Sequence, residues 1–329
     1  AGLAQGAVLH VTAQVPVGTC DEIRRTLLSL RPGLFLMVAY SPENLRLGQA
    51  IERYRKPPLP VLGSDDAGAL DRLEKFYAPC GVTWQRTNLR TAEMSKHALN
   101  TFLALSVTFA NELGNLCDEV GADGHRLAEI LRLEPRVGSK AMLFPGLGFA
   151  GGTLARDVQT LRRLGAQLKL ATPLLDGLWT SNKAQNSTVV LRLHRLLGGL
   201  RGKKIAVWGL TYKPDTSTLR RSAALEVIGD LQREGAQVAA HDPKADPAEL
   251  AQAGFAVAED PLAAAAGADA LVLMTPWAQY RDTDFTRLRA GMAGTLVFDT
   301  AGLWKAEQVT AAGLQYLDIG RGRLARRPG

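Results

Sequence analysis

A long, uninterrupted helical pattern, Thr91–Val120, most constrains what this sequence can fold into. Thr91 is placed to cap its start and Gly121 to follow its end. Its apolar face is broad, so we expect burial on more than one side. That face carries Leu99, Phe102, Leu103, Val107, Phe109 and Leu113. Further helical patterns lie near 124–133, 154–165 and 172–196, so the middle of the chain is predicted to be a helical block.

Short apolar runs bounded by turn residues precede this block, at residues 8–14, 35–41 and 60–64. We expect buried strands there, with helices around 19–30 and 67–78, which is the alternation of a parallel α/β sheet. The segment has no strand–GxGxxG–helix opening and no acidic residue at the end of a second strand, the marks of a complete dinucleotide-binding domain. We therefore expect the second half of a Rossmann-like domain whose first half lies outside this chain.

After a polar link at residues 200–204 the α/β alternation begins again. Strands are expected at 205–210, 236–242, 268–275 and 295–300, with a helix over 220–233. The predicted fold class is therefore α/β, with long central helices that commonly pair across a two-fold axis. Its parts are an incomplete N-terminal Rossmann-like domain (1–88), a central helical dimerisation region (89–199), a C-terminal Rossmann-like domain (200–322) and a basic tail (323–329).

Composition narrows the class of protein. The 329 residues are enough for two or three domains, and no apolar run approaches the length of a membrane span. The opening residues lack the basic start of a secretory signal, and Cys20, Cys80 and Cys117 are scattered without a CxxC pair. We therefore expect a cytoplasmic protein without a metal site. The net charge of +7 comes without a nucleic-acid-binding motif, so phosphate-bearing small molecules are the expected partners, rather than nucleic acid or a membrane.

Five separated segments resemble, in the same order, motifs of the UDP-glucose/GDP-mannose dehydrogenase family. The loop Gly148–Asp157, GFAGGTLARD, resembles that family's catalytic loop GFGGSCFPKD. The other four are Gln14–Thr19 (family STVPVGT), Ser41–Gly48 (PExLREG), Ala92–Asn100 (AExxKxxxN) and Gly209–Thr216 (GLxFKPxT). The sequence GLGFAG at 146–151, which overlaps this loop, matches the dinucleotide-binding pattern GxGxxG. It does not follow a predicted strand, as that pattern requires, so we do not interpret it as a dinucleotide-binding motif. We expect instead a loop whose backbone comes close to a ligand.

The resemblance implies an NAD-dependent dehydrogenase, acting as a homodimer, that oxidises the C6 alcohol of a nucleotide sugar such as UDP-glucose. In that family Lys96 would stabilise charge on the substrate oxygen and Asn100 would position water or substrate. Asp157 would orient a water, and Glu43 would act on water as a base. The implied catalytic set is Lys96, Asn100, Thr153, Asp157 and Glu43. The implied substrate-binding set is Arg136 (from a neighbouring subunit), Gly148, Phe149, Lys213 and Arg220, and the implied cofactor-binding set is Gln14, Val15, Pro16, Glu43 and Arg156.

These residues also have ordinary structural explanations. Lys96 and Asn100 are four apart on a helix and could be two polar residues on a solvent-facing side. Asp157 could favour a helix N-terminus electrostatically, and Glu43 could be a surface turn residue. Lys213, like Arg136, could be a solvated charge.

One departure from the family bears directly on the chemistry. Thr153 stands where the family has its nucleophilic cysteine. The family oxidises the alcohol twice, and the cysteine thiolate adds to the intermediate aldehyde so that a second hydride can leave. A threonine hydroxyl is a poor nucleophile without an activating base, so we expect the reaction to be slow or to stop at the aldehyde. Cys20, which follows the VPVGT turn, is the one cysteine that could replace this nucleophile by lying near the loop in the folded chain.

Further departures alter the substrate and cofactor contacts. Gln14 replaces a threonine, and Leu47 replaces the second glutamate of PExLREG. Arg221 places a positive charge where the family's KPxTxDxRES has the negatively charged glutamate. Ala301 replaces the arginine of the family's DGRN. The base of the nucleotide therefore need not be uracil, and this chain alone is not expected to hold NAD in the usual way.

Two rival functions remain open at this level. A non-catalytic nucleotide-sugar-binding paralogue is favoured by the absent GxGxxG half and by Ala301. Retention of Lys96, Asn100, Asp157 and Lys213 together weighs against it. A 3-hydroxyacid dehydrogenase relative would share the Rossmann and helical plan but would leave the C-terminal α/β domain unexplained.

Overall fold

The computed structural model describes residues 2–45, 49–149, 152–252 and 254–322. Leu47 and the predicted basic tail lie outside these ranges. The chain divides into two compact units, Ala1–Thr101 and Phe102–Gly329, each of which is described by itself. In the described residues no helix is both long and apolar enough to cross a membrane.

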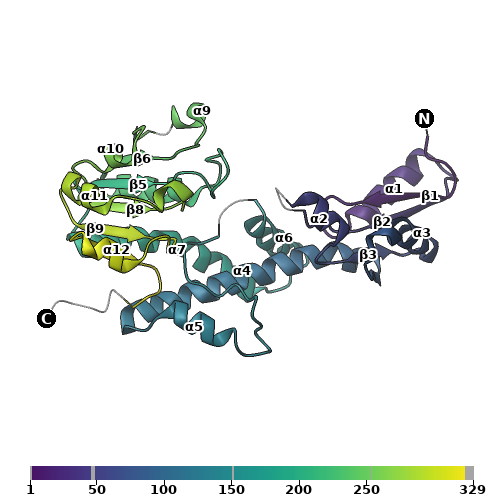
Figure 1. The fold of residues 1–329 in the computed structure, drawn as a ribbon. Coiled ribbons are helices and arrows are strands. Elements are labelled where there is room, and N and C mark those ends of the chain that lie inside the picture. Colours follow the sequence, from purple (N-terminus) through teal and green to yellow (C-terminus); the bar gives the residue numbers. More distant parts are fainter. Residues whose placement is uncertain (1, 46–48, 150–151, 253, 323–329) are drawn as a thin grey trace. The chain divides into compact units, whose positions relative to one another are not determined.

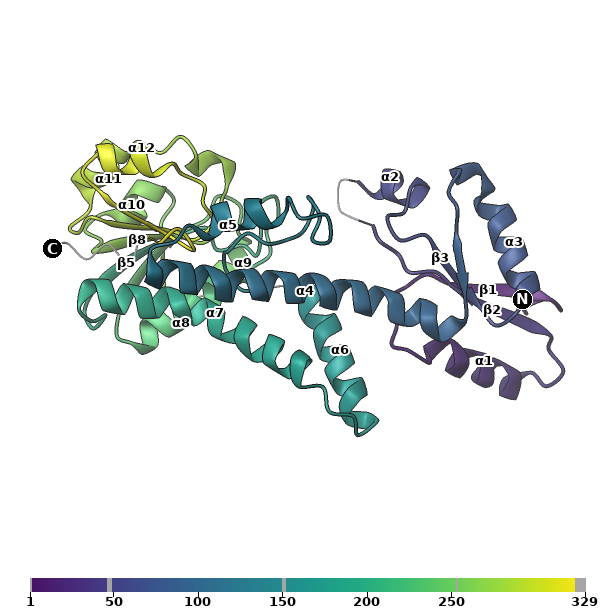
Figure 2. The same cartoon turned by 90° about the horizontal axis from the view of Figure 1, so that it is seen from below.

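The first unit is built on a four-stranded sheet with the strand order β1-β2-β3-β4. Its strands are β1 (Ala7–Val11), β2 (Leu36–Tyr40), β3 (Val61–Ser64) and β4 (Gln85–Thr87), and its helices before the long one are α1 (Thr19–Leu30), α2 (Ala50–Arg55) and α3 (Ala67–Tyr77). All of β2 is buried, because helices cover both faces of the sheet. Leu36, Val38 and Tyr40 pack in one apolar cluster with Cys20 of α1, while the alternate residue Met37 packs in another with residues of α3. Figure 2 shows α1 and α3 on opposite sides of these strands.

The expectation of an all-parallel sheet is wrong for one pair of strands. β1–β2 and β3–β4 are parallel, but β2–β3 are antiparallel, with Ala39 opposite Ser64. A parallel return needs a crossover element long enough to pack on the sheet. In the described residues between β2 and β3, α2 is the one helix, and it spans six residues and buries none of them. The chain therefore comes back antiparallel.

The long helix α4 (Leu89–Val120) begins earlier than predicted. The predicted cap, Thr91, lies inside the first turn, and its backbone N–H donates to the side-chain oxygen of Asn88 at 2.8 Å. Asn88, another residue type that favours the cap position, therefore caps this end. At the other end Gly121 follows the helix with a φ of 79°, as the sequence predicts.

The apolar face of α4 is not buried in the way the sequence predicts. Phe102, Phe109 and Leu116 are 64%, 50% and 64% exposed. The buried face carries small and polar residues instead, such as Ala104 and Asn111. Close packing selects this face, since a Cβ added at Gly114 would lie only 2.4 Å from a side-chain atom of Pro145.

The remaining helices of the central block are α5 (Gly124–Leu131), α6 (Leu154–Gln167) and α7 (Pro173–Leu197), close to the predicted ranges. Pro173 begins α7 and Gly198, with a φ of 69°, ends it. Helix α7 runs alongside the C-terminal part of α4, where Asn115 donates to Gln185 at 2.8 Å (Figure 2). These two helices form the support on which the candidate site is built.

The C-terminal part of the second unit is a doubly wound sheet, green to yellow in Figure 1. Its order is β10-β9-β8-β5-β6-β7, and every pair is parallel. The strands are β5 (Lys204–Trp208), β6 (Gln237–His241), β7 (Ala256–Val257), β8 (Ala270–Leu273), β9 (Leu296–Asp299) and β10 (Gln315–Asp318), and the helices are α8 (Ala223–Arg233), α9 (Pro247–Leu250), α10 (Pro261–Ala265), α11 (Phe285–Gly291) and α12 (Ala306–Ala311). The order reverses between β5 and β8, which is where ligands collect on such sheets. The predicted second Rossmann-like region is confirmed.

Candidate active site

The loop that resembles the family's catalytic segment leads into the N-terminus of α6. Thr153 is exposed at the cap position, and its side chain makes no capping hydrogen bond. Asp157 lies in the first turn, as predicted, and its N–H donates to the carbonyl oxygen of Thr153 at 3.2 Å. Its carboxylate is completely buried, with the nearest guanidinium nitrogen of Arg156 at 3.8 Å. A carboxylate that only favours a helix N-terminus electrostatically can lie on the surface, so that explanation does not account for the burial of Asp157.

A ladder of buried carboxamides holds the start of this loop. Asn111 of α4 accepts from the Gly146 N–H at 2.8 Å, and Gln185 of α7 donates to the Gly146 carbonyl at 2.7 Å. Asn186, the residue after Gln185, accepts from the Gly148 N–H at 3.1 Å. Asn182 closes the ladder by accepting from the Phe149 N–H at 2.8 Å and donating to its carbonyl at 3.2 Å.

Analysis of the sequence did not identify this ladder. A signal was present, since residues 182, 185 and 186 share one face of α7. The ladder also explains Gly148, because a Cβ there would lie 2.6 Å from the Asn182 carbonyl oxygen. Gly148 therefore packs closely against α7, and the predicted approach of this loop's backbone to a ligand stays a prediction.

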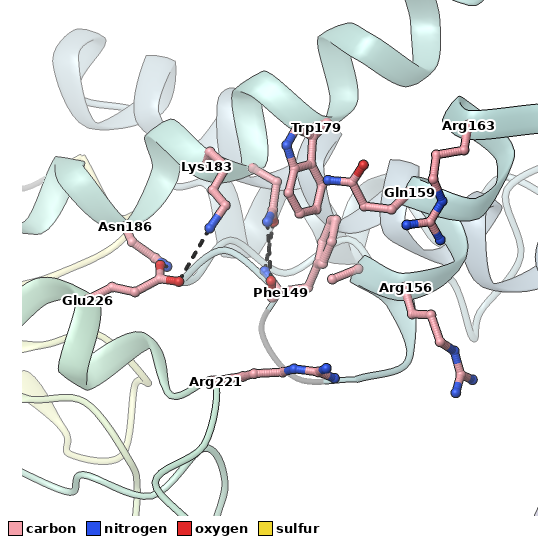
Figure 3. Close-up of a pocket in the computed structure, with 11 residues that line it drawn as sticks. Phe149, Arg156, Gln159, Arg163, Trp179, Lys183, Asn186, Arg221 and Glu226 are labelled. Atoms are coloured by element: carbon pink, nitrogen blue, oxygen red, sulfur yellow. Dashed lines mark hydrogen bonds and ion pairs between the residues drawn. The ribbon is translucent and has the colours of Figure 1, made fainter. Parts of the chain in front are cut away.

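A pocket of about 330 Å³ opens beside the loop, between α6, α7 and the start of α8 (Figure 3). Two of the predicted site residues, Phe149 and Arg156, line it. Its full lining is Phe149, Ala155, Arg156, Gln159, Arg163, Trp179, Asn182, Lys183, Asn186, Arg221 and Glu226. The second unit thus brings the loop, Arg156 and the unpredicted Arg221 together.

The first unit brings a different set of predicted residues together at the start of α4. The Lys96 ammonium donates a hydrogen bond to the side-chain oxygen of Asn44, which is buried at the end of the SPEN segment. Asn100, one turn beyond Lys96, is 4% exposed. The alternative in which both are solvent-facing residues is therefore wrong for Asn100. Glu43 is exposed, as its turn position allows, and its proposed role as a base stays a prediction.

The predicted cofactor loop, which contains Gln14, Val15 and Pro16, is fastened to the same helix. His97 of α4 contacts the Val15 carbonyl at 2.9 Å and the Gln14 amide at 3.5 Å. Glu93 accepts from the N–H groups of Gly18 and Cys20 at 2.5 and 2.8 Å, at the N-terminus of α1. A carboxylate thus occupies the α1 N-terminus, a position that would otherwise attract a phosphate.

Cys20 is ruled out as a replacement nucleophile. The residue is completely buried, and burial together with the Glu93 carboxylate raises the pKa of its thiol to about 12. The thiolate is the reactive form of cysteine, and it is scarce at neutral pH when the pKa is this high.

The described residues do not by themselves fit a whole dinucleotide. In the described part of the first unit no glycine-rich loop joins a strand to a helix. In the C-terminal sheet the loop after β5 has the right place, but Asp242 already accepts from the N–H groups of Leu210 and Thr211 at 2.7 and 3.0 Å. No residue is therefore assigned here to the diphosphate of NAD.

The remaining predicted substrate residues lie on the surface of the second unit. Lys213 is exposed in the loop after β5, at the reversal of the strand order, with its ammonium 5.5 Å from the centre of the Tyr212 ring. Arg220 is exposed just before α8. Arg136 is paired with Glu134 of its own chain at 2.8 Å, and this hydrogen bond lowers the pKa of Glu134. Binding of substrate by these three residues stays a prediction.

Comparison with known proteins shows which protein family has this architecture. Residues 90–184 match the description "UDP-glucose/GDP-mannose dehydrogenase family, central domain", and residues 206–306 match the UDP binding domain of the same family. The chain is 36% identical to a UDP-glucose 6-dehydrogenase of Rhizobium meliloti over 325 residues, which is 96% of this chain and 74% of that protein. A similar enzyme of Pseudomonas aeruginosa is 33% identical, over 98% of this chain and 74% of the relative.

A solved structure agrees. A UDP-glucose dehydrogenase of Pyrobaculum islandicum superimposes with a TM-score of 0.82 at 32% identity, covering 94% of this chain and 70% of that one. The family models, the curated relatives and the solved structure agree, and the chain belongs to the UDP-glucose/GDP-mannose dehydrogenase family.

Proposed function

We propose that this chain is a nucleotide-sugar dehydrogenase of the UDP-glucose type that oxidises the C6 alcohol of a UDP-sugar, with NAD as the hydride acceptor. The observation that carries the proposal is the arrangement at the start of α4. Lys96 is held by the buried Asn44, and the buried Asn100 lies one turn further along the same helix. A preorganised ammonium beside a carboxamide suits an oxygen that gains negative charge during oxidation.

In the proposed first oxidation, the C6 hydroxyl gives its proton to a water molecule as the hydride passes from C6 to NAD, which leaves the aldehyde and NADH. Lys96 stabilises the negative charge on that oxygen, and Asn100 holds the hydroxyl in place. Asn44 keeps the Lys96 side chain from sampling other rotamers, which reduces the ordering cost when the substrate binds. NAD supplies the hydride acceptor when it is bound.

The second oxidation is where this chain would differ from its family. Thr153 is exposed, and none of the described residues hydrogen-bonds to its hydroxyl. Without a base the hydroxyl is not activated for attack on the aldehyde. The aldehyde is therefore the proposed end product, or the slow step.

The proposed enzyme is a homodimer. Phe102, Phe109 and Leu116 are spaced seven residues apart and form an exposed apolar stripe along α4. Large exposed apolar side chains in a row mark an interaction surface. A second copy of the same helix, related by a two-fold axis, is the proposed cover.

A specific observation favours a second candidate function, a nucleotide-sugar-binding protein without catalysis. The hydroxyl of Thr153 lacks a base, and Ala301, in place of the family's arginine, is a small exposed residue. Such a protein would bind UDP-glucose and release no NADH.

The yield of NADH per UDP-glucose consumed separates these possibilities. It is measured with the purified protein and NAD, and UDP-glucose binding is followed in parallel by calorimetry. One NADH per sugar is the expected result. Two NADH per sugar would contradict the role assigned to Thr153. Bound UDP-glucose without NADH would replace the enzyme proposal by the binding-protein proposal.

A further inference from the structure

Arg192 of α7 is a buried cation with partners on α4 and at the end of β10. It is 7% exposed. Its guanidinium pairs with Asp118 at 2.7 Å and donates to the side-chain oxygen of Asn115 at 2.7 Å and to the Asp318 carbonyl at 3.4 Å. A guanidinium has five N–H donors and no acceptor, so every partner must offer it an oxygen. Asn115 therefore has to turn its carboxamide oxygen toward Arg192.

This one orientation fixes the direction of the next two hydrogen bonds. With its oxygen on Arg192, Asn115 is left with its NH2 group, which donates to the side-chain oxygen of Gln185 at 2.8 Å. Gln185, which is 3% exposed, is then left with its own NH2 group, which donates to the Gly146 carbonyl at 2.7 Å. Three hydrogen bonds thus run the same way, from the cation to the backbone of the loop, and bonds aligned in this manner polarise and strengthen one another.

The loop depends on side chains for its position. Among the hydrogen bonds between described residues, none joins the backbone of 144–149 to another backbone group. Both polar groups of Gly146 are bound instead by carboxamides, the N–H by Asn111 at 2.8 Å and the carbonyl by Gln185. The predicted substrate contacts Gly148 and Phe149 follow two and three residues later. A shift of the Gly146 peptide therefore moves both of them.

We propose that Arg192, Asn115 and Gln185 are positioning residues for the nucleotide-sugar substrate, on which they act through the loop backbone. They form a relay that runs in one direction only, because reversing either amide would set two oxygens face to face. The effect on the substrate rests on the proposed function, whereas the effect on the loop does not. Small displacements of groups that hold a substrate are costly, so a fixed Gly146 peptide matters for binding.

Asn115→Asp tests the direction of the relay while keeping its shape. The new carboxylate still accepts from Arg192 but has no hydrogen to donate to Gln185. Gln185 must then turn its NH2 group toward residue 115, which brings its oxygen against the Gly146 carbonyl. Gln185→Glu breaks the last link from the other side, because a carboxylate cannot donate to that carbonyl. Neither variant removes the partner of Arg192 at Asp118.

Asn88→Asp is the matched control. It makes the same chemical change at the exposed start of α4, where an aspartate also serves as a cap. The control should therefore leave the loop as it is.

Hydrogen exchange, followed by mass spectrometry on a peptide spanning residues 143–149, measures the loop directly. The amide hydrogens of this peptide should exchange roughly tenfold faster in Asn115→Asp and in Gln185→Glu, because the partly buried Gly146 carbonyl loses its donor. Asn88→Asp should change the exchange rates less than about twofold. Exchange rates that are equal in all three variants would overturn the proposal.

The NADH assay separates positioning from a simple loss of stability. In both relay variants a displaced loop should raise the KM for UDP-glucose about tenfold and leave kcat within about twofold, because Lys96 and Asn100 do not belong to the relay. A variant that is only less stable contains less folded protein, which lowers kcat and leaves KM unchanged. That second pattern would overturn the positioning role. If the parent protein forms no NADH, the proposed function fails, while the exchange rates still decide for or against the relay.

Discussion

Asp118 carries the interaction that fastens the end of the C-terminal sheet to the central helices. Its carboxylate is completely buried in α4. It accepts hydrogen bonds from the N–H groups of Gly320 and Gly322 at 2.8 and 2.9 Å, and it pairs with Arg192 of α7 at 2.7 Å. Asp118→Asn keeps the shape of the side chain and removes the charge, so the guanidinium of Arg192 remains buried without its counter-ion.

The expected loss follows from this arrangement. Removing one partner of a buried ion pair costs about 3–5 kcal/mol, because an uncompensated charge is left inside. For a unit of this size 1 kcal/mol corresponds to roughly 2–4 °C, so the Tm should fall by about 10 °C. Replacing both partners, as Asp118→Asn with Arg192→Met, should recover part of the loss, since no charge then remains buried.

Thermal unfolding followed by circular dichroism measures this effect, and the next residue along the chain provides the control. Glu119 pairs with Arg195 at 2.8 Å, but both side chains are about half exposed. Glu119→Gln should therefore hardly change the Tm, because exposed ion pairs contribute little. If Asp118→Asn shifted the Tm no more than Glu119→Gln does, the role assigned to the buried pair would be refuted.

Three further predictions concern the site and the surface. Thr153→Cys should raise the NADH yield from one to two per UDP-glucose, while Thr153→Ser should leave it at one. Phe109→Glu should shift the chain from dimer to monomer in light scattering at micromolar concentration. Leu191→Glu, at an apolar residue of α7 that is 65% exposed, should not. Cys20 should resist iodoacetamide at pH 8 while the partly buried Cys80 reacts, because the folded-state pKa of Cys20 is about 12. Since this pKa is raised from 9.0, the free energy of unfolding should fall as the pH rises above about 9. Rapid alkylation of Cys20 in the folded protein would contradict its assigned environment.

Much of the fold was predictable because it depends on local periodicity. Helix α1 has the bounds that the sequence indicated. Five strands, β2, β3, β6, β8 and β9, fall inside the predicted apolar runs, while β1 and β5 begin one residue before theirs. Strands β4, β7 and β10 were missed because all three are short edge strands with exposed residues, so none carries a continuous apolar run. The antiparallel β2–β3 pair was missed because strand direction depends on how a connection packs, which periodicity does not report.

The site was predictable where a motif carried it and hidden where long-range contacts build it. Asp157 lies in the helix turn that the resemblance predicted. Asn182 and Asn186 look like ordinary polar residues on a helix, and the backbone groups that they bind are 33 and 38 residues away. The burial of α4 was mispredicted for a related reason, because an apolar stripe in a sequence does not say whether its partner belongs to the same chain.

Arg221 and Gly152 bear on which of the two functions is correct. A site that decays after losing its nucleophile accumulates changes that need not fit one another. Here the residue beside Thr153 has lost its side chain, and the cation that replaces the family's acid fills the vacated space. The cation is held there by a strained backbone, which is retained only where the surrounding structure or a ligand compensates for it. Gly152 and Arg221 therefore fit one another, which favours a maintained site at this loop over a decayed one, whether the oxidation stops at the aldehyde or does not begin.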